Sequence, residues 1–160
     1  MAALDKIDLR ILSVLQHDAS LSAAEIADAV GLSQSPCWRR IQRLKDEGYI
    51  LRTVAVLDRR RLGLHAQLFV QVKVLRNDQM NLQEFSQAIR NFPEVIECHM
   101  VLGMFDFLLR VVTHDITSYE KFFLESLSRL PNVREFNSYV AVSEIKSTTV
   151  LPLPPPGPQL

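Results

Sequence analysis

The spacing of apolar residues changes once along this chain of 160 residues, and the change divides it into two parts. Up to residue 50, apolar residues recur every three or four positions, which is the spacing of one face of a helix. From residue 66 onward, stretches of strict alternation are interleaved with helical stretches, which is typical of a sheet covered by helices. The pattern predicts an α+β protein with an all-helical N-terminal part.

Three helices are expected within the first 50 residues, and the local signals mark where they begin and end. An apolar face over residues 4–15 defines the first helix. The second begins after Ser22, which forms a capping box with the glutamate three positions later, and it ends at Gly31. The third begins after Ser33, a good N-cap residue, and Gly48 is its expected left-handed C-cap.

The second and third of these helices have the features of a helix-turn-helix unit, whose second helix enters the major groove of DNA. Basic charge gathers here: residues 38–61 carry eight Lys or Arg and three Asp or Glu, in a chain of zero net charge. Arginine can pair with guanine, and glutamine with adenine. A three-helix bundle with a solvated basic face is the alternative, and burial in the core is equally open for Trp38. The predicted DNA-binding residues are Ser33, Gln34, Ser35, Trp38, Arg39, Arg40 and Arg43.

The second part of the chain has the order β-α-β followed by β-α-β, which predicts a ferredoxin-like βαββαβ domain. Helices on one side of such a sheet leave its other face to be covered, and a second copy in a two-fold homodimer would cover it. Whether the arginines of the linker grip phosphates or are merely solvated stays open. The expected division is a helix-turn-helix domain at 1–56, a linker at 57–65, an αβ domain at 66–153 and a Pro-rich tail at 154–160.

A glycine and an aspartate stand at the tight connection between the two middle strands. Backbone N–H groups around Gly103 can receive a carboxylate, and Asp106 can accept from an amine, so the connection could bind a free amino acid. The alternative is an ordinary hairpin in which the aspartate satisfies local backbone groups, and composition alone favours it.

The sequence also excludes several classes of protein. It contains no nucleophile–base arrangement, no paired catalytic carboxylates and no glycine-rich phosphate loop, so we expect neither an enzyme nor a cofactor. The two cysteines, Cys37 and Cys98, are far apart, which excludes a disulfide scaffold and a CxxC zinc site and suits the cytoplasm. No apolar run approaches the ~18–20 residues of a membrane span, and the acidic start is unlike a signal peptide. We therefore expect no metal site and no membrane partner.

Taken together, these segments resemble the leucine-responsive regulator (Lrp/AsnC) family of bacterial and archaeal transcription factors. Residues 4–12 resemble the family's opening helix, 31–41 its recognition helix, and 43–50 the exit from it. Residues 103–109 resemble the turn of its effector domain, and 138–153 resemble its closing strands. The resemblance spans roughly residues 4–153.

The resemblance implies an N-terminal DNA-binding domain and a C-terminal domain that dimerises and binds an effector. Family dimers commonly assemble to octamers, with small amino acids at the joints between dimers. Ser138 matches a strand position where the family usually has Thr, and Phe107 stands where many members have Tyr. The runner-up is a small enzyme or amino-acid-binding module whose helical part is a dimerisation arm. The implied effector-binding residues are Gly103, Met104, Asp106 and Ser138.

Overall fold

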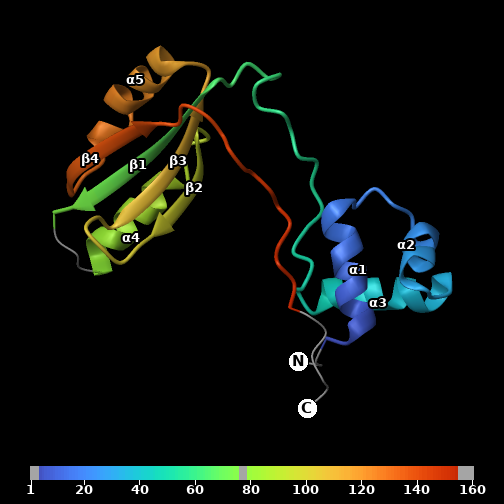
Figure 1. Ribbon diagram of the computed structural model, residues 1–160. Helices are drawn as coiled ribbons and strands as arrows, with labels where there is room; N and C mark the ends of the chain where they lie inside the picture. The colour runs from blue at the N-terminus through green and yellow to red at the C-terminus, as the bar shows by residue number, and fades with distance from the viewer. Residues whose placement is uncertain (1–3, 76–78, 155–160) are drawn as a thin grey trace. The chain divides into compact units, whose positions relative to one another are not determined.

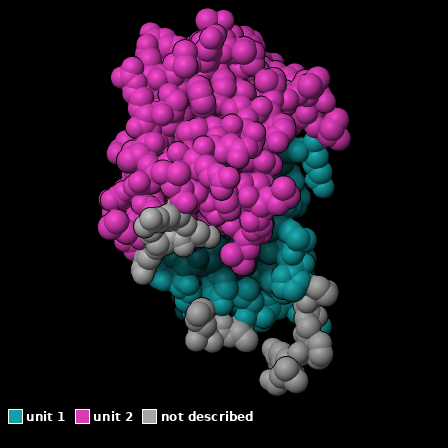
Figure 2. All heavy atoms as spheres, turned by 90° about the vertical axis from the view of Figure 1, so that its left-hand side faces the viewer, with its two compact units in different colours: residues 1–56, 146–160 teal, residues 57–145 magenta. Residues whose placement is uncertain are grey.

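The computed structural model describes residues 4–75 and 79–154, which form two compact units (Figures 1 and 2). The first unit joins the N-terminal residues up to Val56 to the segment that begins at Lys146. The second unit spans Leu57–Ile145. No helix among the described residues is long and apolar enough to span a bilayer.

The first unit contains the three expected helices. They are α1 (Lys6–His17), α2 (Ala23–Val30) and α3 (Gln34–Asp46). Ser22 caps α2 through the predicted capping box with Glu25, and Gly31 ends it with a left-handed backbone at φ 75°. Ser33 has the extended backbone of an N-cap, but its hydroxyl forms no capping hydrogen bond to α3. The buried core of the unit consists of Ile11, Ile26, Ala27, Val30, Cys37, Ile41 and Leu44.

The second unit is a four-stranded antiparallel sheet in the order β2-β3-β1-β4, which confirms the ferredoxin-like fold. Both central strands, β1 and β3, are thereby bordered on each side. The strands are β1 (Ala66–Val74), β2 (Val95–Met100), β3 (Phe107–Thr113) and β4 (Val133–Val140). The helices are α4 (Gln79–Ile89), α5 (Ile116–Glu125) and the short 3-10 helix η1 (Leu127–Arg129).

One face of this sheet is packed and the other is open. Leu68, Val70 and Val72 of β1 are buried against aromatic side chains of the two helices, such as Phe85 and Phe122. Alternate residues of β1 lie on the opposite face, where Phe69 is 38% exposed. The helices therefore cover one face of the sheet, and the described chain leaves the other face without a covering layer.

The C-terminal segment differs from the expectation of closing strands up to residue 153. No strand is present between residues 141 and 154. The pairing with β1 ends where Ala141 N–H donates to Gln67 O, because β1 begins only one residue before Gln67. The segment instead contacts α1, where the side-chain amide of Gln16 exchanges two hydrogen bonds with the backbone of Leu151. Most of the Pro-rich tail predicted at 154–160 lies outside the described residues.

The predicted linker, 57–65, contains a local turn held by side-chain hydrogen bonds. Asp58 accepts hydrogen bonds from the N–H groups of Arg60 and Arg61 and so caps a single turn. Gly63 closes this turn at φ 78°, and its carbonyl lies 3.1 Å from Nδ1 of His114. The segment groups with the second unit, and only the stretch before it, up to Val56, groups with the helices.

Candidate DNA-binding face and effector hairpin

The outer side of α3 carries most of the residues predicted to bind DNA. Gln34, Ser35 and Arg39 are exposed, and so is the preceding Ser33. Trp38 is 53% exposed, so it is a surface residue rather than part of the core. The apolar stripe of α3 faces α1 and α2 and turns these polar side chains outward.

Arg40 and Arg43 lie elsewhere on the same helix, against α1. Arg40 Nη1 is 2.6 Å from Asp5 Oδ2 and 2.8 Å from Asp8 Oδ1. Arg43 Nη2 is 2.5 Å from Asp8 Oδ2. The carboxylate of Asp8 is 1% exposed, so both guanidinium groups are engaged by a buried anion within the unit.

The two aspartates also cap α1 itself. Asp5 accepts hydrogen bonds from the N–H groups of Ile7 and Asp8, and Asp8 accepts one from the N–H of Asp5. Burial raises the pKa of Asp5, but hydrogen bonds from the Asp8 N–H and the Arg40 guanidinium lower it by more. The pKa of Asp5 therefore lies below its ordinary value. The hydrogen bonds that Arg40 donates to the same two carboxylates raise the pKa of its guanidinium.

Gln42 belongs to the outer face of α3 and was missed by sequence reasoning. It is half-buried and lies four residues after Trp38 and three after Arg39, so the three share one side of the helix. The helical spacing from Ser35 would have revealed it, since Gln42 follows by two turns.

The predicted effector residues of the second unit are divided between two places. Gly103 and Met104 lie in the hairpin between β2 and β3, which is closed by a hydrogen bond of 2.9 Å from Val101 N to Asp106 O. Met104 is 94% exposed and Leu102 is fully exposed. The hairpin tip therefore presents apolar side chains and backbone to the solvent.

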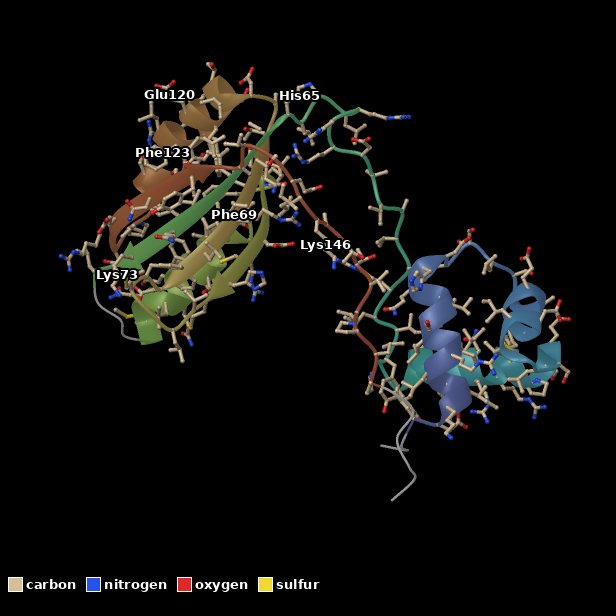
Figure 3. The ribbon with its side chains drawn as sticks, viewed as in Figure 1. His65, Phe69, Lys73, Glu120, Phe123 and Lys146 are labelled. Atoms are coloured by element: carbon tan, nitrogen blue, oxygen red, sulfur yellow. The ribbon has the colours of Figure 1, made fainter. Side chains whose placement is uncertain are left out.

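Asp106 itself is 4% exposed, and both oxygens of its carboxylate have partners within the chain. Oδ2 accepts from the N–H of Val74 at 2.9 Å, and Oδ1 lies 3.1 Å from Nζ of Lys73, labelled in Figure 3 at the end of β1. The backbone N–H of Asp106 donates to Val72 O. The carboxylate of Asp106 is therefore bonded to the neighbouring strand β1, more than 30 residues away in the sequence, and not to the local backbone groups of its own turn.

Ser138 lies on β4 and is separated from β3 by β1, so it does not adjoin Asp106. Its hydroxyl is 2.5 Å from the hydroxyl of Tyr119 on α5. Burial raises the pKa of Tyr119, although the hydrogen bond to Ser138 acts in the opposite direction. Ser138 thus belongs to the helix-covered side of the sheet, and the structure brings together only the hairpin residues of the predicted set.

Among the described residues, no group of three or more His, Cys, Asp or Glu is arranged to hold a metal ion. Cys37 is buried in the helical core, where burial raises the pKa of its thiol.

Comparison with known proteins agrees with both halves of this description. A family model described as winged helix-turn-helix DNA-binding matches residues 4–50, and one described as Lrp/AsnC ligand binding domain matches residues 67–151. The chain is 42% identical over 147 residues to a proline dehydrogenase transcriptional activator of Rhizobium radiobacter, covering 92% of this chain and 94% of that protein. It is 36% identical to the leucine-responsive regulatory protein of Escherichia coli over 92% of this chain and 90% of that one.

Solved structures give the same result. A transcriptional regulator from Neisseria meningitidis in complex with L-Met superposes with a TM-score of 0.90 at 35% identity, covering 94% of this chain and 97% of that one. An AsnC-family transcriptional regulator from Agrobacterium tumefaciens gives a TM-score of 0.89 at 39% identity, covering 93% and 97% of the two chains.

A helix-turn-helix unit followed by a ferredoxin-like ligand-binding domain defines a DNA-binding transcriptional regulator rather than an enzyme. The chain belongs to the Lrp/AsnC family of such regulators.

Proposed function

We propose that this regulator reads operator DNA with the outer face of α3 and that a small free amino acid alters its DNA binding by changing its assembly. The proposed DNA binding rests on the exposed polar face of α3, opposite its buried apolar stripe. This face carries Gln34, Ser35, Trp38 and Arg39. A helix presented in this way can enter the major groove, where arginine and glutamine distinguish base pairs.

Individual roles follow from side-chain chemistry. Arg39 can pair with guanine, and Gln34 and Gln42 can pair with adenine. Ser33 and Ser35, at the start of α3, suit contacts to phosphate, because the N-terminus of a helix favours anions. A DNA partner and two cysteines that form no disulfide both suit a protein of the cytoplasm.

The hairpin tip at Gly103 and Met104 is the proposed place of the amino-acid effector. Its exposed backbone can receive a carboxylate, and its exposed apolar side chains can pack against an aliphatic or thioether side chain. The L-Met complex of the relative supports an amino acid as the ligand class. We assign Asp106 to the support of this hairpin, and Ser138 stays a proposed contact from β4.

The open face of the sheet is the proposed homodimer interface. Phe69 of β1 pairs in register with Tyr139 of β4, and both side chains are partly exposed on this face, at 38% and 53% (Figure 3 labels Phe69). A stable two-fold interface needs about 800 Å² from each partner, an area that the face of a four-stranded sheet can supply. Further assembly of dimers, commonly to octamers in this family, would bring hairpin tips of different dimers together.

Trp38 provides the experiment, because it is the single tryptophan of the chain and lies on the proposed DNA face. We expect duplex DNA to quench or shift its fluorescence at low salt, and the apparent affinity to fall steeply as salt is raised. An amino acid added alone should leave the Trp38 signal unchanged. Fluorescence that does not respond to any duplex, in a folded protein, would contradict the DNA-binding assignment of this face.

A further inference from the structure

Two neighbouring arginines of α3, Arg39 and Arg40, have opposite surroundings. Arg39 is exposed, and among the described residues no ion pair is found for it. Arg40 and Arg43, three positions apart and so on one side of the helix, both reach Asp8 at the start of α1. The basic character of α3 therefore has two components, one facing the solvent and one facing α1.

Arg40 and Arg43 are held by the carboxylate of Asp8, and separating this carboxylate from them would cost much free energy. Asp8 is buried at 1% exposure and has a guanidinium nitrogen within 2.8 Å of each of its oxygens. A buried carboxylate without a cation costs far more than a solvated one, because water no longer compensates its charge. If Arg43 turned toward a DNA phosphate, one oxygen of the buried Asp8 carboxylate would lose its cationic partner, and this loss would oppose the phosphate contact.

The same contacts define the orientation of α3. The apolar stripe of Cys37, Ile41 and Leu44 keeps α3 against the other helices, but the hydrophobic effect that drives this burial is non-directional. Charge-assisted hydrogen bonds to Asp8 from two positions along the helix are directional. They add the constraint that apolar packing lacks.

We propose that Arg40 and Arg43 are positioning residues, which lock the rotation of α3 through Asp8 and Asp5 so that the outer face meets the bases, and do not themselves contact DNA. This inference rests on the proposed DNA binding. It gives the two arginines a role different from that of Arg39, although the three belong to one basic run.

Replacement of Asp8 by asparagine separates positioning from direct contact, because the two roles predict opposite signs. If Arg40 and Arg43 bind phosphate, Asp8→Asn releases them and adds positive charge, so affinity for any duplex rises. If they position α3, Asp8→Asn weakens binding to the operator by about tenfold, the cost of a displaced base contact. Binding to a scrambled duplex and the dependence on salt then change little, since no phosphate contact is lost.

The measurement uses the full chain and two fluorescein-labelled duplexes: the tightest one that the wild type selects from a random library, and a scrambled version of it. Fluorescence anisotropy gives both dissociation constants over a range of salt. Asp28→Asn is the matched control, because it removes the same charge from an exposed position on α2. Circular dichroism identifies the temperature range in which each variant is folded.

Two milder variants keep the test decisive if Asp8→Asn does not fold. Asp5→Asn retains the buried anion and removes one contact to Arg40, and Arg43→Lys retains the charge without the planar fork of donors. Each should lower the ratio of operator to scrambled affinity, whereas Asp28→Asn should not. A ratio equal to that of the wild type in these folded variants, or a rise in affinity for both duplexes, would overturn the positioning role alone. A wild type that selects no duplex would overturn the DNA-binding function and this role with it.

Discussion

Arg39 is the residue on which base recognition by α3 depends most directly. It is exposed beside Trp38, and its guanidinium can form a bidentate contact with guanine. We expect Arg39→Ala to weaken operator binding by about 1–3 kcal/mol and to relax specificity at one base pair. The control is Arg129→Ala, which removes an exposed arginine from the second unit. Gel-shift titration would show equal affinities for Arg39→Ala and Arg129→Ala if Arg39 made no base contact.

Asp106 is the residue through which the hairpin is supported. Asp106→Ala removes the acceptor of the buried Val74 N–H, which should cost about 1–3 kcal/mol of stability. We expect the same change to abolish the response to an amino acid while DNA binding is retained, because the hairpin loses the side-chain contacts that join it to Lys73 and Val74 of β1. Asp106→Asn keeps an acceptor and should lose less stability.

Thermal denaturation with and without each amino acid measures both effects, since a bound ligand raises the melting temperature. If Asp106→Ala keeps the wild-type ligand affinity and the same ligand-dependent change in oligomer size, Asp106 is only a turn residue.

At the scale of helices and strands, local signals were sufficient to predict most of the fold. Ser22 and Gly31 mark the two ends of α2, because a capping box and a left-handed glycine act on residues only a few positions away. The alternation along β1 predicted its buried face for the same reason. Such signals do not depend on distant parts of the chain.

Signals that connect distant residues could not be read from the sequence. Asp8 precedes Arg40 by 32 residues, and nothing local indicates that this acid takes up two arginines of the basic run. Lys73 and Asp106 are 33 residues apart. The strand expected beyond residue 140 is absent because the pairing with β1 ends where Ala141 N–H donates to Gln67 O, one residue from the start of β1. The sequence alone therefore predicted that α3 was basic but not which of its charges were free.

The contact between α1 and α3 should depend on pH. Because the pKa of Asp5 lies below its ordinary value of 3.8 in the folded chain, its contribution to stability is present above that value and is lost as the pH falls through the folded pKa. Asp5→Asn retains an N-cap but not the ion pair with Arg40. The wild type should therefore be more stable than this variant at neutral pH, by an amount that is constant above about pH 5 and vanishes in stronger acid.

Urea denaturation followed by circular dichroism between pH 7 and pH 3 tests this expectation. A difference between wild type and Asp5→Asn that stays constant throughout that range would show that the charge of Asp5 does not stabilise the fold.

At the scale of the whole molecule, the open face of the sheet determines assembly. Phe69→Glu places a charge at the centre of the proposed interface and should weaken the dimer at least tenfold, since an unpaired buried charge opposes association. Leu124→Glu on α5 is the matched control, because Leu124 is 56% exposed on the helical side of the sheet. Sedimentation velocity should show a monomer for Phe69→Glu and a dimer or larger species for Leu124→Glu. A wild type that is monomeric at micromolar concentration would contradict the interface.

The most direct test of the regulator as a whole is a titration of the wild-type chain with its selected duplex, repeated in the presence of each of the twenty amino acids. Trp38 fluorescence reports DNA binding, and light scattering on the same samples reports the size of the assembly. A ligand can alter DNA affinity only by binding two states of the protein differently. We therefore predict that at least one amino acid changes DNA affinity and assembly size together. DNA binding that is intact and indifferent to all twenty, with an unchanged assembly, would contradict an amino-acid-responsive regulator.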